Sequence, residues 1–218
     1  MRVAIVGGHG KVARHLHPIL ARAGHTPVAL VRREEYRAEL EDLGAEPRLL
    51  DIERSEVADF AVAFEGCDAV VFTAGGGPDG NVERKRTVDL GGSLKSIEAA
   101  GQSRIRRFVQ VSAINVDQPV PADAPSAWKA YVEAKRDADT ALRASDLDWT
   151  ILRPGGLTDG PGSGLVSIAP ELPRGEVARV DVAAVVAAVL ENEASIGHQW
   201  TLVGGDTPVA EAVARAAG

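Results

Sequence analysis

Short apolar runs alternate along the whole chain with longer stretches of helical pattern, and this alternation limits the possible folds more than any other feature. The apolar runs, read as strands, lie at about 2–6, 27–31, 47–50, 68–74, 106–112, 148–153 and 199–203. The helical patterns lie at about 11–23, 34–44, 54–65, 82–101, 127–145, 180–192 and 208–216. Strands that alternate with helices in this way form βαβ units with right-handed crossovers. The sequence therefore predicts an α/β fold with a doubly wound parallel sheet.

The length and composition fit a single domain that spans residues 1–218. Single cores stop growing at roughly 250–300 residues, so 218 residues fill one generous domain. Aromatic residues make up only 4% of the chain, so Val, Leu, Ile and Ala must pack most of the core. Two stretches interrupt the alternation, at about 75–81 and about 154–178. Both follow strand ends, where open α/β sheets bind ligands, and we expect 154–178 to form a short substrate lid.

The charge and the rare residue types exclude several classes of protein. A net charge of −7 argues against a nucleic-acid or anionic-membrane surface. A single cysteine, Cys67, excludes an internal disulfide, and the histidines show no metal-ligand spacing. No apolar run approaches the roughly 20 residues that span a bilayer, and the N-terminal run is too short for a signal peptide. We expect a cytoplasmic protein, a monomer or a homodimer, whose partner is a small-molecule substrate rather than a nucleic acid, a membrane or a metal.

A glycine-rich segment joins the first strand to the first helix and reads Gly7-Gly8-His9-Gly10-Lys11-Val12-Ala13. Gly7 permits a tight turn, Gly10 lets backbone N–H groups approach a pyrophosphate, and Ala13 lets the helix pack close to the sheet. The helix N-terminus favours the negative charge of the phosphates. Such a pattern is weak alone, but here it follows an apolar strand and opens an amphipathic helix. We expect a Rossmann-type dinucleotide site at Gly7, Gly8, His9, Gly10, Lys11 and Val12; the alternative is a tight turn with no ligand.

A pair of arginines follows the second strand. The run 27–31 ends in Arg32-Arg33, where an NAD-specific site places an acidic residue against the ribose hydroxyls. A basic residue there suits the 2′-phosphate of NADP, so NADP(H) is the favoured cofactor and NAD(H) the alternative. Arg32 and Arg33 can also be solvated surface residues. Asp51, after the third strand, either contacts the adenine amino group or caps a turn.

Further segments carry a family resemblance when they are taken together with the glycine loop and Val31-Arg32. They are Val70-Val71-Phe72-Thr73-Ala74-Gly75-Gly76, Arg107-Phe108-Val109-Gln110-Val111-Ser112, Tyr131-Val132-Glu133-Ala134-Lys135, Thr150-Ile151-Leu152-Arg153-Pro154-Gly155 and Arg179-Val180-Asp181-Val182-Ala183. In this order and spacing the chain resembles, over essentially its whole length, the atypical short-chain dehydrogenase/reductase superfamily, in its NAD(P)H-binding, NmrA-like branch. Members of that branch are often called NAD-dependent epimerase/dehydratases or NAD(P)-binding oxidoreductases. The resemblance implies that Thr73, Ala74 and Gly75 lie against the cofactor.

Three residues match the catalytic set of that superfamily. Ser112 ends the fifth strand, and Tyr131 and Lys135 are four residues apart, so they share one face of a helix. A tyrosine with its ordinary pKa of about 10 is a poor acid or base at neutral pH, and a nearby ammonium lowers that pKa. The resemblance implies that Ser112 holds a substrate carbonyl or hydroxyl, Tyr131 transfers a proton, and Lys135 also binds the nicotinamide ribose. Pro154 and Gly155, which end the sixth strand, are expected to line the nicotinamide pocket.

The chain departs from the superfamily pattern in ways that leave the function open. Asp89 stands where a helical Asn is usual. The extended enzymes carry a larger C-terminal substrate domain, whereas within residues 1–218 we expect only the segment at about 155–178 to form a lid. The leading expectation is an NADP-dependent oxidoreductase that acts on a small carbonyl, alcohol or quinone-like substrate. One alternative is a sugar-nucleotide epimerase or dehydratase. The other is a non-catalytic sensor of NADP(H), in which Tyr131 packs at the cofactor rim and Lys135 binds ribose only.

Overall fold

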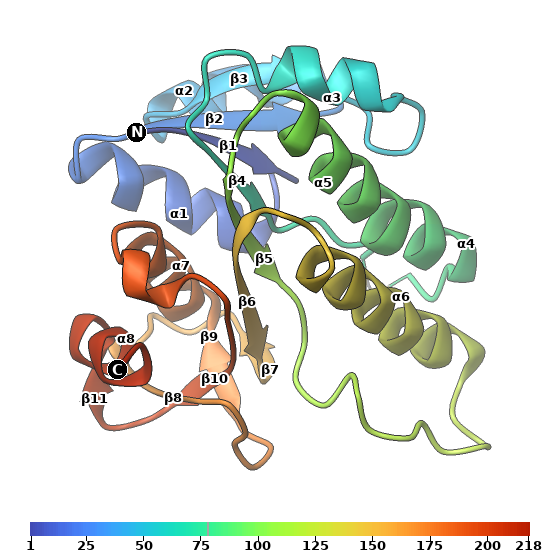
Figure 1. Cartoon of the computed structure of the whole chain (residues 1–218), viewed down its shortest axis with the longest axis vertical. Helices are drawn as coiled ribbons and strands as arrows, with labels where there is room; N and C mark the ends of the chain where they lie inside the picture. The colour runs from blue at the N-terminus through green and yellow to red at the C-terminus, as the bar shows by residue number, and fades with distance from the viewer. Residues whose placement is uncertain (78) are drawn as a thin grey trace.

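The central feature of the fold is a mostly parallel sheet with helices on both faces (Figure 1). The computed structural model describes residues 1–77 and 79–218. Within these residues the parallel strands are β1 (Arg2–Val6), β2 (Thr26–Val31), β3 (Glu46–Leu49), β4 (Ala69–Phe72), β5 (Arg107–Val111), β6 (Asp148–Pro154) and β10 (His198–Gly204). Two antiparallel strands, β8 (Leu165–Ala169) and β11 (Thr207–Pro208), extend the sheet beyond β10. The order across the sheet is β11-β8-β10-β6-β5-β4-β1-β2-β3.

The helices form two layers that cover opposite faces of the sheet. The first layer holds α1 (Lys11–Arg22), α2 (Arg37–Asp42), α7 (Arg179–Leu190) and α8 (Val209–Ala216). The second holds α3 (Val57–Ala63), α5 (Gly92–Gln102) and α6 (Ser126–Arg143), and the short helix α4 (Val82–Arg84) lies between α3 and α5 in the chain. Short helical turns lie at η1 (Glu34–Tyr36), the π-helix η2 (Lys85–Gly91) and η3 (Glu193–Ser195). No helix in the described part of the chain is long and apolar enough to cross a membrane.

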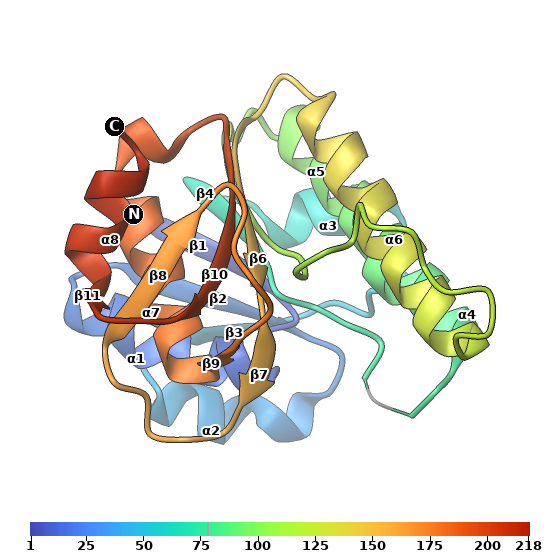
Figure 2. The same ribbon diagram turned by 90° about the horizontal axis from the view of Figure 1, so that it is seen from below.

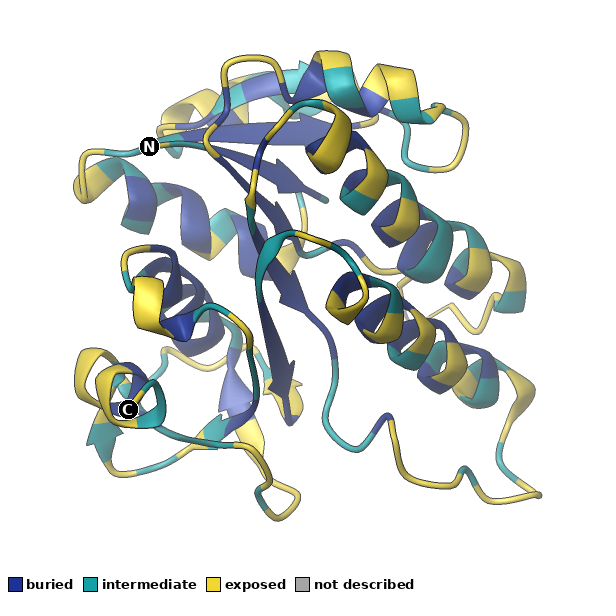
Figure 3. Ribbon diagram, viewed as in Figure 1, coloured by how far each residue is buried: buried dark blue, intermediate teal, exposed yellow. Residues whose placement is uncertain are grey.

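The strands are buried on both faces, as the continuous apolar runs require. The side chains of Val3–Val6 in β1 are fully buried and alternate between two hydrophobic cores. One core lies against α1, α7 and α8, and the other against α3 and α5. In Figure 3 the sheet is dark blue, whereas the outer faces of the helices are yellow. This double burial is the reason that the parallel strands are rich in Val, Ile and Ala rather than alternating with polar residues.

The structure confirms the expected α/β fold in a single domain, with corrections to two segments. The expected lid at 154–178 contains three strands: β7 (Gly156–Thr158), β8 and β9 (Glu176–Ala178). β7 and β9 pair with each other, and β8 pairs with β10 (Figure 2). The expected helix at 82–101 is divided into α4, η2 and α5. Both differences depend on tertiary contacts. The three strands are short and form only by pairing with other strands, and the π-helix places Asp89 where it accepts the backbone N–H of Gly76.

The sheet topology places the carboxyl ends of four neighbouring strands at one edge. The strand order reverses between β1 and β4, and open α/β sheets bind ligands at such a switch point. The segments that follow β1, β4, β5 and β6 begin at Gly7, Thr73, Ser112 and Gly155. Residues that are far apart in the sequence therefore meet at this edge.

Candidate dinucleotide and substrate site

A cavity lies at the switch point and is surrounded by the loops after β1, β2, β3 and β4. Eight of the expected cofactor residues line it: Gly7, His9, Gly10, Arg32, Asp51, Thr73, Ala74 and Gly75. The set joins a glycine loop, a helix N-terminus and a basic residue at the end of β2. This combination fits a dinucleotide whose pyrophosphate lies on the loop and whose adenosine half lies against β2.

The glycines of the loop are required by close contacts with the neighbouring strands. Gly7 has a φ of +84°, and a Cβ atom there would lie 2.8 Å from the Cα of Ala74. A Cβ atom on Gly8 would lie 2.8 Å from the Cα of Ala29. Gly10 is the N-cap of α1, and no side chain caps the helix at this end. The first backbone N–H groups of α1 are therefore free of side-chain acceptors and are available to an anion.

A buried histidine supports the loop from behind. The Nε2 atom of His17 lies 2.6 Å from the carbonyl oxygen of Gly8. Burial lowers the pKa of His17, so the imidazole is neutral at neutral pH and its Nε2–H group donates to this carbonyl. From the sequence, His17 is one of the histidines without metal-ligand spacing, and no contact with the loop is predicted for it. Its position between Leu16 and Leu20 on the apolar face of α1 was the available signal for burial.

The two arginines after β2 have different surroundings. Arg32 lines the cavity, whereas Arg33 lies outside the lining and forms an ion pair of 3.0 Å with Glu35. Tyr36, which sequence reasoning missed, also lines the cavity, and its ring stacks on His9 with ring centroids 3.7 Å apart. The structure thus separates Arg32, which faces the candidate adenosine site, from Arg33.

Three of the expected cofactor residues also make contacts within the protein, whether or not they line the cavity. Asp51 lines the cavity and also caps a turn, because its Oδ1 atom accepts N–H bonds from Glu53 at 3.0 Å and Arg54 at 3.3 Å. Val12 packs into the core on the α1 side. Lys11 lies outside the cavity lining and pairs with Asp159 at 2.7 Å.

A second cavity of about 590 Å³ lies beside the first and has a size typical of small-molecule sites. Ser112, Tyr131, Pro154 and Gly155 line it, so four further expected site residues meet here. Lys135 lies between the two cavities. Its Nζ atom is 3.4 Å from the carbonyl oxygen of Ala74 and 3.2 Å from that of Val111, the neighbour of Ser112.

Lys135 has a buried counter-ion, Asp89, and the two charges act in opposite directions on the pKa of Tyr131. The Nζ atom of Lys135 lies 3.4 Å from Oδ1 of Asp89, and both side chains are buried. The other carboxylate oxygen of Asp89 accepts the N–H of Gly76 at 2.8 Å. Burial raises the pKa of Tyr131, Lys135 opposes this, and the carboxylates of Asp89 and Asp139 add to the rise. Lys135 lowers the pKa of Tyr131 as expected, but desolvation outweighs the ammonium and the pKa of Tyr131 is raised overall.

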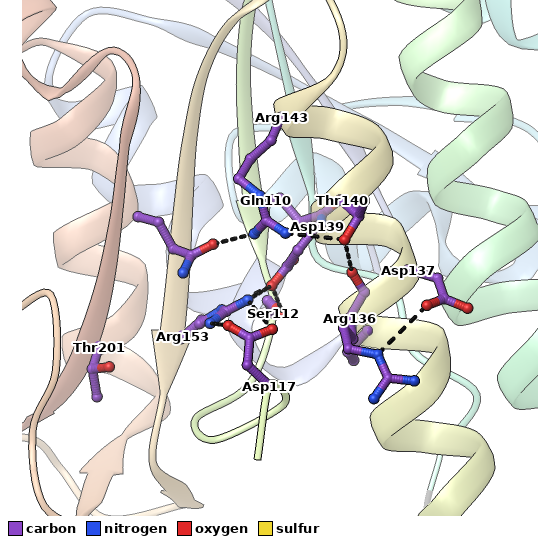
Figure 4. Close-up of polar contacts among 12 residues, drawn as sticks. Gln110, Ser112, Asp117, Arg136, Asp137, Asp139, Thr140, Arg143, Arg153 and Thr201 are labelled. Carbon is purple, nitrogen blue, oxygen red and sulfur yellow. Dashed lines mark hydrogen bonds and ion pairs between the residues drawn. The ribbon is translucent and has the colours of Figure 1, made fainter. Parts of the chain in front are cut away.

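Ser112 belongs to a buried polar network (Figure 4). Its Oγ atom donates to Oδ2 of Asp139 at 2.9 Å, and Gln110 donates to Oδ1 at 2.7 Å. Arg153 donates to the same carboxylate at 2.8 Å and also binds Asp117 at 2.6 Å. Burial raises the pKa of Asp139, and Arg153 opposes the rise. Since every partner of Asp139 is a donor, it acts as the acceptor that fixes the hydroxyl direction of Ser112.

Two members of this network were only partly predictable from the sequence. Tyr131, Lys135 and Asp139 follow one another at intervals of four residues, so they share one face of α6, and this spacing was an available signal for Asp139. The role of Arg153 was open, and the structure shows it as an ion-pair partner. No group of metal-binding side chains occurs among the residues that the structure describes.

Comparisons with known proteins identify the family. The model of a family described as NAD(P)H-binding matches residues 7–193. The "uncharacterized sugar epimerase YhfK" of Bacillus subtilis is 41% identical over 214 residues, which cover 98% of this chain and 99% of that protein. A solved "putative NAD-dependent epimerase/dehydratase" from Bacillus halodurans has a TM-score of 0.91 and 38% identity, with 99% of both chains covered.

A more distant solved structure shares the fold. A short-chain dehydrogenase/reductase from Veillonella parvula, in complex with NADP, has a TM-score of 0.71 at 19% identity, over 95% of this chain and 98% of that chain. At this identity the likeness extends to the architecture alone. From the family match and the two nearer relatives, the chain belongs to the NAD(P)H-binding family.

Proposed function

We propose that this protein is an NADP(H)-dependent oxidoreductase of the atypical short-chain dehydrogenase/reductase type that reduces a small carbonyl or quinone-like substrate. The observation that carries this proposal is the placement of Lys135 between two adjoining cavities. One cavity has the lining of a dinucleotide site, and the other contains Ser112 and Tyr131. The family membership supports an NAD(P)H cofactor, and Arg32 in the lining of the first cavity favours NADP(H).

The proposed chemistry adds a hydride and a proton across the carbonyl group. When it is bound, the nicotinamide supplies the hydride to the carbonyl carbon. Tyr131 donates the phenolic proton to the carbonyl oxygen, and a raised pKa keeps this proton in place at neutral pH. This protonation state favours the direction of reduction. Ser112 presents its oxygen to the cavity while its hydrogen is donated to Asp139, so it accepts a hydrogen bond from the product hydroxyl.

Two successive measurements test the proposal. The purified protein is titrated with NADPH and with NADH by fluorescence, and NADPH oxidation is then followed against aldehydes, ketones and quinones. We expect tighter binding of NADPH and net oxidation with at least one carbonyl class. Failure of both dinucleotides to bind would overturn the proposal as a whole. Tight NADPH binding with no turnover of any class would leave the cofactor sensor as the function.

Replacing Arg32 by serine tests the cofactor preference. Arg32 lines the first cavity at the end of β2, where the 2′-phosphate is expected. We expect Arg32→Ser to weaken NADPH binding about tenfold and to leave NADH binding unchanged, because a charge-assisted bond at an exposed site contributes about 1.4 kcal/mol. Arg33→Ser is the matched control, since Arg33 pairs with Glu35 outside the cavity. Equal losses in the two variants would contradict this assignment.

Replacing Asp89 by asparagine tests the electrostatics around Tyr131. The protonated tyrosine is the proposed donor, so turnover persists below its pKa and falls as the pH rises through it. Asp89 is among the groups that raise this pKa. Asp89→Asn removes that negative charge, and we expect the high-pH limb of the kcat/KM profile to move to lower pH. Glu83→Gln, at an exposed position of α4, is expected to leave the profile unchanged. A shift to higher pH in Asp89→Asn would refute the proposed coupling.

An epimerase or dehydratase is the second candidate, and the names given to the Bacillus subtilis and Bacillus halodurans relatives favour it. Such an enzyme returns the hydride to its substrate, so the cofactor undergoes no net oxidation. Incubation with nucleotide sugars and analysis of the products by chromatography distinguishes the two functions. An isomerised or dehydrated sugar with no change in NADPH absorbance would favour this candidate over the reductase.

A further inference from the structure

The substrate cavity carries a charge opposite to that of the whole protein. The chain has a net charge of −7, yet the charged side chains among the described residues that line this cavity are Lys85 and Arg179. No Asp or Glu belongs to the described lining. A local excess of positive charge in an acidic protein points to a ligand that brings negative charge of its own.

Lys85 is the lining cation that forms no ion pair among the described residues. Its side chain is 7% exposed, and its Nζ atom donates to the carbonyl oxygen of Gly77. Among the residues that the structure describes, no carboxylate lies within ion-pair distance of this atom. Among the described residues its one hydrogen-bond acceptor is a neutral carbonyl, and an ammonium held on a largely buried side chain without a counter-ion at contact distance is costly. A bound anion would remove that cost.

Arg179 differs from Lys85 in this respect. Its guanidinium forms an ion pair of 2.6 Å with Asp159, a carboxylate that also pairs with Lys11 at 2.7 Å. Of the two cations in the described lining, Lys85 is therefore the one with no carboxylate at ion-pair distance. One such charge matches one monoanionic group.

The position of Lys85 connects this charge with the proposed reaction. Its Nζ atom lies 5.8 Å from the centre of the Tyr131 ring, on the same cavity wall. The other walls include the apolar side chains of Ile114, Trp128 and Leu157. A ligand that fills this space thus has an apolar body, a reacting group at Tyr131 and an anionic group at Lys85.

We propose that Lys85 binds a carboxylate of the substrate, so that the preferred substrates are carbonyl compounds that carry a carboxylate on an apolar body. This inference rests on the proposed function for the reacting carbonyl, but the anion site itself does not depend on turnover. Lys85 would hold the substrate with its carbonyl group near Tyr131. The alternative role of Lys85 is structural, as a donor that fixes the backbone at Gly77.

A binding experiment separates these two roles. The purified protein, with and without NADP⁺, is titrated by calorimetry with benzoate, cinnamate and naphthoate, each compared with its neutral primary amide. We expect at least one acid to bind roughly tenfold or more tightly than its amide, because the ammonium contacts the carboxylate in a partly desolvated site. If none of the three acids binds the wild-type protein more tightly than its amide does, the inference is overturned.

Variants then assign the preference to Lys85. We expect the preference for acids to disappear in Lys85→Met and to persist in Lys85→Arg, which retains the cation. Lys129→Met is the matched control, since Lys129 lies on α6 outside the cavity lining and donates to the carbonyl oxygen of Ala122. A preference that survives in folded Lys85→Met would overturn the inference. The acid–amide comparison on the wild-type protein does not depend on the folding of any variant.

Failure of the carboxylate site can be told apart from failure of the proposed reductase function. If NADPH is oxidised by neutral and anionic carbonyl compounds alike, the reductase stands and the carboxylate site fails. If acids bind through Lys85 but neither dinucleotide binds, the carboxylate site stands and the reductase fails.

Discussion

Replacing Asp139 by alanine is expected to lower the free energy of unfolding by about 3–5 kcal/mol, the cost of removing one partner of a buried ion pair. The side chain of Asp139 is fully buried and accepts hydrogen bonds from Gln110, Ser112 and Arg153. Its removal leaves three buried donors without this acceptor, and the guanidinium of Arg153 is buried as well. Urea denaturation followed by circular dichroism measures the loss.

The control for this substitution lies on the same helix. Asp137→Ala removes an exposed carboxylate whose partner, Arg136, is 3.7 Å away. We expect a change within about 0.5 kcal/mol, as for other exposed positions. If Asp139→Ala is no more destabilising than Asp137→Ala, the network of Figure 4 does not stabilise the protein in the way its contacts suggest.

Replacing Tyr131 by phenylalanine is expected to lower kcat for carbonyl reduction by about 10²–10⁴-fold, the usual contribution of a positioned acid. The phenylalanine ring occupies the same volume, so the cavity wall is preserved and the affinity for NADPH should stay unchanged. Stopped-flow reduction of the best carbonyl substrate gives the rate, and fluorescence titration gives the affinity.

Glu133→Gln provides the comparison, because Glu133 lies on the exposed side of α6 two residues away. Its turnover should equal that of the unmodified protein. Unchanged turnover in Tyr131→Phe would show that another group protonates the carbonyl oxygen. A loss that appears entirely in NADPH affinity would show that Tyr131 only packs at the cofactor rim.

The fold was largely predictable because local patterns encode most of it. The central strands are continuous apolar runs, and the helices between them carry apolar faces of helical period. The glycine loop was predictable for a related reason, since Gly7 needs a positive φ and Gly8 needs room beside Ala29. In each case the constraint acts on residues that are close in sequence or on a single backbone position.

The parts that the sequence did not predict depend on contacts between distant segments. β8 pairs with β10, about 35 residues later in the chain, and its alternating pattern is short and surrounded by Gly and Pro. The counter-ion of Lys135 is Asp89, and the different surroundings of Arg32 and Arg33 follow from the cavity walls. Composition and periodicity carry no information about such partners. The candidate catalytic residues were therefore predictable as residue types, but the charges around them were not.

The π-helix η2 offers a simple route by which the ligand preference of the substrate cavity could change in evolution. A π-helical turn holds one residue more than an α-helical turn, so a single-residue insertion creates it and a single-residue deletion removes it. Each residue advances an α-helix by about 100°. A deletion between Lys85 and Asp89 would therefore turn Lys85 out of the cavity while Asp89 kept its place beside Lys135. Loss of one codon would be enough to alter which ligand charge the cavity accepts, with the rest of the sheet edge intact.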